Sequence, residues 1–235
     1  MLIDSILRSV KRTLVFAFLF IFSQIKIMAQ EKPILFYFGD PMCSWCYGFS
    51  PEFGKVAEAV KGIADIRLVM GGLRPYNTET MADLGEFLTH HWDDVGRRSG
   101  QPFRFDILQK QDIVYDTEPA CRAVVTAANM DSTLAFPYFK AVQTAFYFEN
   151  KDPNLTKNFV ELAGTFNLDK KVFEKLFESE EMKNAVREDF ATAAEMGVRG
   201  FPTVVLKNGD DFYLLTNGYA LAEGIIEKIT TIIDR

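Results

Sequence analysis

Two cysteines separated by two residues, between a short apolar segment and a helical pattern, constrain this 235-residue chain more than any other feature. Residues 33–38 (PILFYF) are apolar and rich in aromatic side chains, and Gly-Asp-Pro follows them, which predicts a buried strand. From Cys43 to Val60 the apolar residues recur every three or four positions, which predicts a helix beginning near Cys43. Pro51 lies inside this stretch and is expected to kink the helix or to delay its regular part.

The remaining pattern predicts an α/β protein with a helical middle. Residues 66–70 (IRLVM) predict a second strand, and strand, helix and strand at this length predict a βαβ unit with parallel strands. The middle of the chain favours helices over residues 117–130, 136–148, 154–166, 169–178 and 180–196. Two strands, 203–206 and 212–215, then flank a five-residue connection with the hairpin signal Asn208-Gly209, and residues 221–233 predict a final amphipathic helix.

Residues 1–29 have the layout of a secretory signal peptide. Three basic residues within 8–12 precede an unbroken apolar run, 14–22, and a more polar segment ends at Ala29. The run is too short to span a bilayer, so we expect a cleaved leader, a mature chain without a stable membrane span, and a periplasmic or secreted protein. Lys26 and Ile27 fit the pattern poorly. Translation starting at Met28 would give a cytoplasmic protein instead, and an uncleaved leader would be a retained membrane anchor.

Composition excludes several other classes. With 48% hydrophobic and 25% charged residues the chain is not disordered, and a net charge of −6 argues against a nucleic-acid partner, which would favour a basic surface. Three cysteines are too few for a disulfide-stabilised scaffold, so their role is expected to be chemical.

The position of Cys43 and Cys46 predicts redox chemistry. Free N–H groups and the helix dipole at a helix amino terminus favour a thiolate at Cys43. Cys46, about one turn further on, is close enough to form a disulfide but is more buried. Cys43 would therefore attack a substrate sulfur and Cys46 would resolve the mixed disulfide, so that the reversible Cys43–Cys46 disulfide serves in place of a cofactor.

Two alternatives fit the same spacing. The pair could be half of a zinc site, for which only Cys121, His90, His91 and carboxylates remain as ligands, or it could be a fixed structural disulfide. Adjacent histidines on a helix point about 100° apart, so both cannot easily bind one metal. The strand before the pair, the helix after it and the βαβ continuation favour redox catalysis, and no metal site is expected.

A second motif, Gly200-Phe201-Pro202-Thr203, directly precedes a predicted strand. A proline at the first residue of a strand is allowed, and tight turns are where cis X-Pro bonds occur. A cis Pro202 would leave the backbone of Phe201 free to pair with an extended substrate. A trans proline that simply ends a loop is the alternative.

These motifs resemble those of the DsbA-like branch of the thioredoxin superfamily, and most closely the FrnE-type disulfide isomerases. Residues 40–49 (DPMCSWCYGF), 116–123 (DTEPACRA) and 197–203 (GVRGFPT) carry the resemblance, in the expected order. It implies a thioredoxin-like core, residues 30–75 and 197–235, with a large all-helical insertion, residues 76–196, between the βαβ unit and the C-terminal hairpin and helix. It also implies a cis Pro202 facing Cys43.

The resemblance implies a thiol–disulfide oxidoreductase or isomerase that acts on cysteine-containing client proteins and exchanges electrons with an unidentified redox partner. Ser44 and Trp45 stand where the best-known relatives carry a histidine, and neither supplies a cation. Asp40 would oppose a thiolate, so we expect a milder oxidant. A glutathione-dependent transferase or isomerase of the same superfamily, or a non-catalytic zinc- or peptide-binding module, remains as an alternative.

Several other residues are candidates for the site. Trp45, Tyr47, Phe201 and Thr203 could line an apolar groove for unfolded polypeptide. Glu118 could carry a proton to Cys46, or could simply favour its helix amino terminus. Cys121 could be a third redox group near the site or a small buried core residue.

Overall fold

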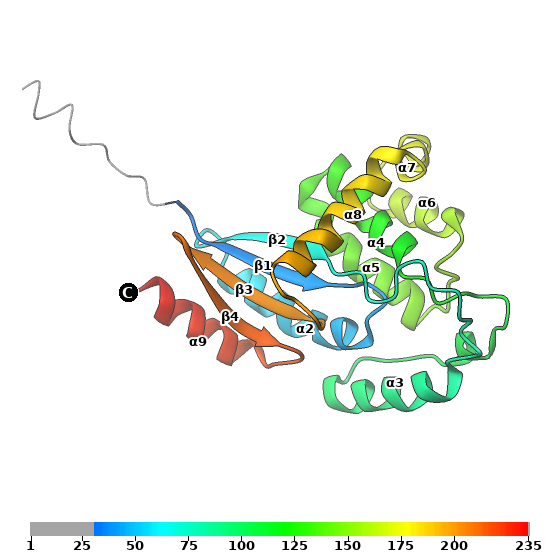
Figure 1. Cartoon of the computed structure of the whole chain (residues 1–235), viewed down its shortest axis with the longest axis horizontal. Helices are drawn as coiled ribbons and strands as arrows, with labels where there is room; N and C mark the ends of the chain where they lie inside the picture. Colours follow the sequence, from blue (N-terminus) through cyan, green and yellow to red (C-terminus); the bar gives the residue numbers. More distant parts are fainter. Residues whose placement is uncertain (1–30, 235) are drawn as a thin grey trace, which may run out of the picture. The chain divides into compact units, whose positions relative to one another are not determined.

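A four-stranded mixed sheet lies at the centre of the structure, a computed structural model that describes residues 31–234. The strands are β1 (Ile34–Gly39), β2 (Asp65–Met70), β3 (Thr203–Asn208) and β4 (Asp211–Asn217), in the order β2-β1-β3-β4 (Figure 1). β1 and β2 are parallel and joined by a helix, which confirms the predicted βαβ unit. The expected leader, residues 1–29, lies outside the described residues.

The pairing of β3 with its neighbours sets the geometry of the site. β3 runs antiparallel to β1, and Phe38 is paired with Thr203, so the chain leaves β1 and enters β3 at the same end of the sheet. The β3–β4 hairpin is tighter than expected. Asn208 pairs with Asp211, which leaves two turn residues rather than five, and Gly209 takes a φ of 61° that suits the first position of such a turn.

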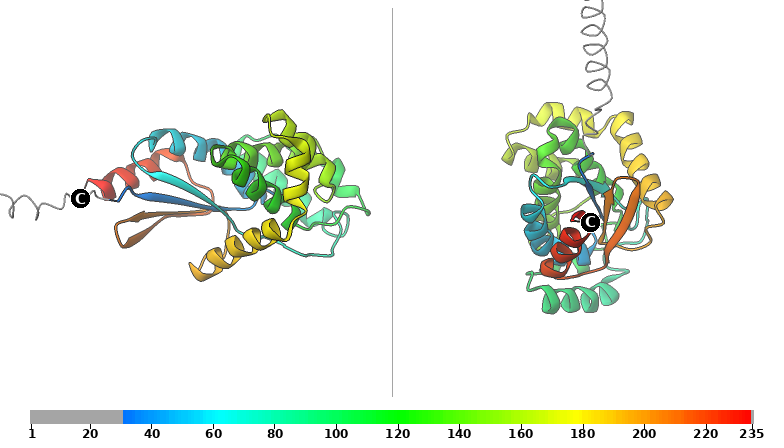
Figure 2. Two further views of the ribbon diagram at one scale, coloured as in Figure 1. Left: turned by 90° about the horizontal axis from the view of Figure 1, so that it is seen from above. Right: turned by 90° about the vertical axis from the view of Figure 1, so that its left-hand side faces the viewer.

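Helices cover both faces of the sheet (Figure 2). On one face, α2 (Ser44–Ala59) and α9 (Ala222–Ile233) enclose the main core, to which β1 contributes Leu35 and Tyr37. On the other, α8 (Glu180–Glu195) covers a smaller cluster that contains Phe36 and Phe38. The alternation of β1 side chains between the two clusters follows from the two-residue period of a strand.

The helical middle has the predicted position between β2 and β3. Its elements are α3 (Gly85–Ser99), α4 (Glu118–Met130), α5 (Ala135–Tyr147), α6 (Thr156–Thr165), α7 (Lys170–Phe177) and α8. α8 was expected within the insertion, yet it packs on β2 as well as on α4, so it also belongs to the covering of the sheet. Among the described residues, the helices are too short or too polar to cross a membrane.

α2 runs from Ser44 to Ala59 through Pro51, so its regular part is not delayed, which was one of the two effects expected of this proline. Proline has no N–H for the carbonyl of Tyr47, one turn earlier. The side-chain amide of Gln101 donates to that carbonyl instead, at 3.1 Å. The freed carbonyl thus finds a tertiary partner, and the helix begins at Ser44, directly after Cys43.

α3 is a helix that our sequence analysis did not assign. Leu88, Trp92 and Val95 recur at helical spacing and are all buried, and Gly100 ends the helix with a φ of 75°. Both signals are visible in the sequence. His90 and His91 lie on this helix, and His91 is half-buried against Trp45, with ring centroids 6.0 Å apart.

Asp189 on α8 makes the stability of the fold depend on pH. Its Oδ2 accepts a hydrogen bond from the Met70 N–H at 3.0 Å, and burial raises the pKa of the carboxyl to about 6 although that N–H and Arg67 lower it. The folded state therefore holds this proton more tightly than the unfolded state. The resulting stabilisation is complete below pH 4 and is lost as the pH rises through 6.

We predict that Asp189→Asn removes this dependence. The amide oxygen can still accept from Met70, but no charge has to be buried, so the variant should be more stable by about 1–2 kcal/mol at pH 7.5 and unchanged at pH 4. Urea unfolding of both proteins at the two pH values measures the difference. A difference that is the same at both values would contradict the assignment.

Candidate active site

The dithiol lies at the amino terminus of α2, as the sequence predicted. Cys43 is the N-cap residue, with extended backbone (φ −87°, ψ 116°), and Cys46 lies in the first turn. Both are free thiols in the structure; Cys43 is 5% exposed and Cys46 is fully buried. Cys46 is the more buried of the two, as expected, and both sulfurs are largely removed from water.

The turn before β3 lies directly against Cys43. The Phe201–Pro202 peptide bond is cis, which confirms the prediction for Pro202. The Cys43 Sγ donates to the Phe201 carbonyl at 3.5 Å. Thr203 is buried, and its hydroxyl donates to the Gly200 carbonyl at 2.8 Å, so it holds the turn.

Gly71 sets the position of the Phe201 ring. The glycine follows β2, and its N–H donates to the Gly39 carbonyl at 2.8 Å. A Cβ atom at Gly71 would lie 2.1 Å from two carbons of the Phe201 ring. Only a glycine leaves room for the ring here, so this close contact fixes the turn that carries Pro202.

Asp40, three residues before Cys43, is a fully buried carboxylate beside the dithiol. It accepts hydrogen bonds from the backbone N–H groups of Met42 at 2.8 Å and Leu73 at 2.7 Å. Burial raises its pKa, although these hydrogen bonds lower it. The carboxylate in turn raises the pKa of the Cys46 thiol, which burial and Cys43 already raise well above its ordinary value.

Cys121 and Glu118 lie on α4, and among the described residues their hydrogen bonds go to groups other than the dithiol sulfurs. The Cys121 Sγ donates to Asp40 Oδ2 at 3.3 Å, and burial raises its pKa well above the ordinary value. Glu118 forms a buried ion pair with Arg122 at 2.8 Å, and Arg122 also donates to the Phe177 carbonyl. The Glu118 carboxylate is thus engaged in joining α4 to the end of α7, which favours the structural alternative.

The aromatic residues of the motif have different surroundings. Trp45 is half-buried between His91 of α3 and Tyr219, which follows β4. Tyr47, expected in a substrate groove, is instead buried. Its ring stacks on Tyr147 with centroids 4.8 Å apart, and its hydroxyl donates to the Pro102 carbonyl at 3.0 Å. Helical periodicity turns Tyr47 toward the helical layer rather than toward the turn that carries Pro202.

Two buried tyrosines near the dithiol were not identified from the sequence. The Tyr115 hydroxyl donates to the Met42 carbonyl at 2.6 Å and so supports the loop before Cys43. Tyr37 of β1 lies beneath α2, and its fully buried hydroxyl has no hydrogen-bond partner among the described residues. Strand periodicity places Tyr37 in the core, but no sequence signal shows which group its hydroxyl faces.

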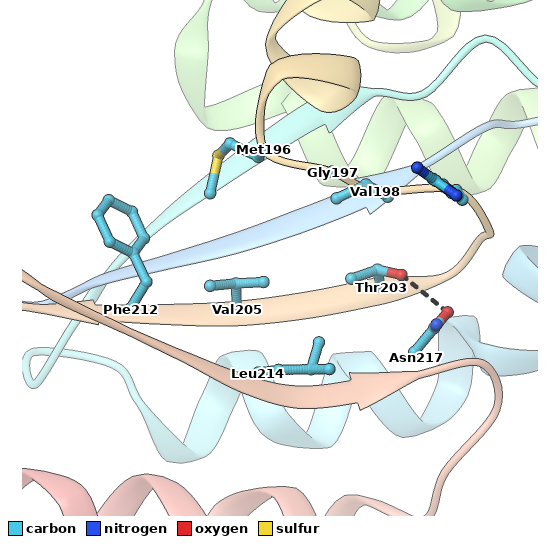
Figure 3. Close-up of a pocket in the computed structure, with 9 residues that line it drawn as sticks. Met196, Gly197, Val198, Thr203, Val205, Phe212, Leu214 and Asn217 are labelled. Carbon is cyan, nitrogen blue, oxygen red and sulfur yellow. Dashed lines mark hydrogen bonds between the residues drawn. The ribbon is translucent and has the colours of Figure 1, made fainter.

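An apolar groove of about 520 Å³ extends from the turn before Pro202 along β3 and β4 (Figure 3). Phe212 and Leu214 on β4 are more than half exposed, and they lie at one side of this groove. Its lining consists of the following residues: Met196, Gly197, Val198, Arg199, Thr203, Val205, Phe212, Leu214 and Asn217. Of the four residues predicted to contact substrate, the lining includes Thr203.

Residues 31–234 contain no group of three or more His, Cys, Asp or Glu side chains arranged to hold a metal ion. Cys121 contacts Asp40, whereas His91 contacts Trp45. The ligands that the zinc alternative required therefore lie in different surroundings.

The chain is similar to several known proteins. A model of the DSBA-like thioredoxin domain matches residues 34–219. A protein from Nitrosomonas europaea, provisionally described as a protein disulfide isomerase, is 34% identical; the match has a TM-score of 0.81 and covers 87% of this chain and 98% of that one. The cytosolic disulfide reductase DsbM from Pseudomonas aeruginosa is 26% identical, with a TM-score of 0.73, over 86% and 98% of the two chains.

A curated relative differs in length. The ClpXP adapter protein SpxH from Bacillus subtilis is 24% identical over 181 residues, which are 76% of this chain. This chain spans 60% of the length of that relative, and the same share of the SpxH from Halalkalibacterium halodurans, which is 28% identical.

We predict that Gly71→Ala slows thiol exchange at Cys43 at least tenfold, because the new methyl group must displace the Phe201 ring and with it the carbonyl that contacts Cys43. The rate of reaction with an aromatic disulfide that releases a coloured thiol measures the effect. Gly54→Ala is the matched control, since a Cβ there, on α2, meets no atom within 4 Å. Equal rates for the two variants would contradict the prediction.

Proposed function

The chain belongs to the DSBA-like thioredoxin domain family, and on that premise we propose that Cys43 and Cys46 exchange disulfides with the cysteines of protein substrates. The family and the relatives named as disulfide isomerase and reductase support thiol–disulfide oxidoreductase chemistry in general. The observation that carries the proposal is the 3.5 Å contact between the Cys43 Sγ and the Phe201 carbonyl, which brings the turn before β3 to the more exposed cysteine of the pair.

The exchange proceeds in two balanced steps. The Cys43 thiolate attacks one sulfur of a substrate disulfide; a bond from Cys43 to that sulfur forms, the substrate disulfide breaks, and the other substrate sulfur leaves as a thiolate. Cys46 then attacks the Cys43 sulfur, the Cys43–Cys46 disulfide forms, and the first substrate sulfur leaves with a proton. The substrate gains two electrons and the protein loses two; the reverse sequence oxidises a dithiol.

The Cys43–Cys46 disulfide carries both electrons, so the proposed reaction needs no bound cofactor. Client proteins with cysteines are the substrates, and a second, unidentified redox partner restores the starting state. We place the protein in the periplasm or outside the cell, on the evidence of the leader pattern in residues 1–29; translation from Met28 would place it in the cytoplasm.

The direction of exchange depends on the charges beside the dithiol. Ser44 and Trp45 contribute no positive charge between the cysteines, and the buried Asp40 carboxylate raises the pKa of Cys46. Both features disfavour thiolates, and thereby the reduced state that a strong oxidant must stabilise. The proposed protein is therefore a mild oxidant, suited to isomerisation or reduction.

The central prediction concerns a pair of variants. Cys46→Ser should accumulate mixed disulfides with client proteins, because Cys43 can still attack but nothing resolves the product, whereas Cys43→Ser should accumulate none. Non-reducing electrophoresis of the variants isolated from cells after acid trapping measures the adducts. If both variants behave like the unmodified protein, the proposed function is wrong.

Equilibration with reduced and oxidised glutathione tests the direction. We expect the Cys43–Cys46 pair to have a reduction potential nearer to that of a disulfide reductase or isomerase than to that of a strong oxidant. Asp40→Asn should make the pair more oxidising, since it removes the carboxylate charge that opposes the thiolates. A strongly oxidising unmodified protein would reject the expectation.

Two other functions are separable by the same variants. DsbM has also been solved with GSH, at 26% identity to this chain, so a glutathione-dependent transferase or isomerase remains a second candidate. Such an activity would survive Cys46→Ser. A peptide-binding role, such as the adapter function for which the curated relatives are named, would survive loss of both cysteines. Metal analysis of the purified protein tests a zinc module.

A further inference from the structure

The resolving cysteine presents a physical difficulty that the proposed function does not by itself solve. Cys46 is fully buried, and burial, Cys43 and the Asp40 carboxylate all raise its pKa, while the backbone N–H of Asp40 lowers it. A thiolate that forms at such a place is strongly disfavoured unless local donors stabilise it. A donor that can reach the Cys46 sulfur is therefore needed in the second step.

The Asp40 carboxylate does not meet this need. Its oxygens already accept from Met42, Leu73 and Cys121, and as an acceptor it opposes negative charge on a sulfur nearby. Tyr147 of α5 also lies within electrostatic reach of Cys46, since both cysteines raise the pKa of its phenol. Its hydroxyl is likewise buried without a partner among the described residues, but its ring stacks on Tyr47, whereas Cys46, Phe49 and Phe53 share another face of α2.

Tyr37 has the properties of the missing donor. Its side chain is fully buried, and its hydroxyl is a donor without a partner among the described residues. An unpaired buried hydroxyl costs about 1–3 kcal/mol, so phenylalanine would be the more stable residue if the hydroxyl had no task. The ring packs against Phe49 and Phe53, which lie three and seven residues after Cys46 and so share its face of α2. Burial, Cys46 and Cys43 raise the pKa of the phenol, which keeps it protonated.

The surroundings of Tyr37 hold the hydroxyl in one place. The ring stacks on Phe53 with centroids 4.3 Å apart and meets Phe49 and Phe139 edge-on at 5.9 and 5.8 Å. Gly39 is also close, since a Cβ atom there would lie 3.1 Å from the Tyr37 Cζ and 3.3 Å from its hydroxyl oxygen. The ring therefore cannot turn its hydroxyl away to another partner without repacking the core.

We propose that Tyr37 is a catalytic residue whose hydroxyl donates a hydrogen bond to the Cys46 sulfur while the mixed disulfide is resolved. The inference rests on the proposed function, because it concerns the second of its steps. As Cys46 attacks the Cys43 sulfur, its proton passes to the departing substrate sulfur, which takes the electron pair of the broken bond. Tyr37 keeps its own proton throughout and stabilises the negative charge at Cys46.

Reaction of the reduced protein with an excess of an aromatic disulfide that releases a coloured thiol tests the proposal. Attack by Cys43 releases the first coloured thiol, and displacement by Cys46 releases the second, so two phases report the two steps. Tyr37→Phe should slow the second phase about tenfold, the effect of one hydrogen bond to a charged group, and leave the first within twofold. The pH midpoint of the second phase should rise.

The control variant is Tyr138→Phe. Tyr138 is also fully buried, but its hydroxyl donates to the Phe159 carbonyl at 2.8 Å, in the helical layer. Tyr138→Phe should lower the melting temperature and leave the rates of both phases unchanged. Tyr37→Phe should leave the melting temperature unchanged or raise it. Replacement of Tyr37 by a fluorinated tyrosine, a stronger donor, should speed the second phase.

The outcomes separate the two proposals. An unmodified protein that lacks the second phase would overturn the proposed function itself. A second phase that is present, and equally fast in Tyr37→Phe, would overturn only the role of Tyr37. A large loss of stability in Tyr37→Phe would also overturn it, because it would show that the hydroxyl is used in folding.

Discussion

The contact between the Cys43 sulfur and the Phe201 carbonyl joins two segments that lie 158 residues apart in the sequence, and the rest of the site depends on it. The antiparallel pairing of β1 and β3 makes it possible, since Phe38 faces Thr203 and both loops emerge at one end of the sheet (Figure 1). Gly71 completes the arrangement, because the Phe201 ring occupies the space that any side chain there would need.

Burial gives the dithiol its chemical character. The Asp40 carboxylate and the Tyr37 hydroxyl lie beside sulfurs that are almost wholly removed from water, where each charge or hydrogen bond has a larger effect than it would on the surface. A carboxylate opposes negative charge on the thiols and a hydroxyl favours it. In the proposed exchange these two groups act on Cys46 in addition to burial and Cys43, which raise its pKa the most.

Most of the fold could be predicted from local patterns. The four strands, the βαβ unit and the helix that starts at Cys43 follow from hydrophobic periodicity and from turn residues, and the structure confirms them. Pro51 does not delay the regular part of α2, and a distant amide, that of Gln101, satisfies the carbonyl that proline leaves free. The prediction that Tyr47 lines a substrate groove was wrong. Helical periodicity shows which residues share a face of α2, but not which layer of the fold that face contacts.

The sequence by itself determined the cysteine pair, its place at a helix amino terminus and the proline turn that accompanies it, because these depend on residue type and short spacing. Only the tertiary structure decided that Glu118 is paired with Arg122, that Cys121 contacts Asp40, and that the Tyr37 hydroxyl is left without a partner beside Cys46. Contacts of this kind arise between segments far apart in the chain. Their energies depend on distance and burial, which no local pattern contains.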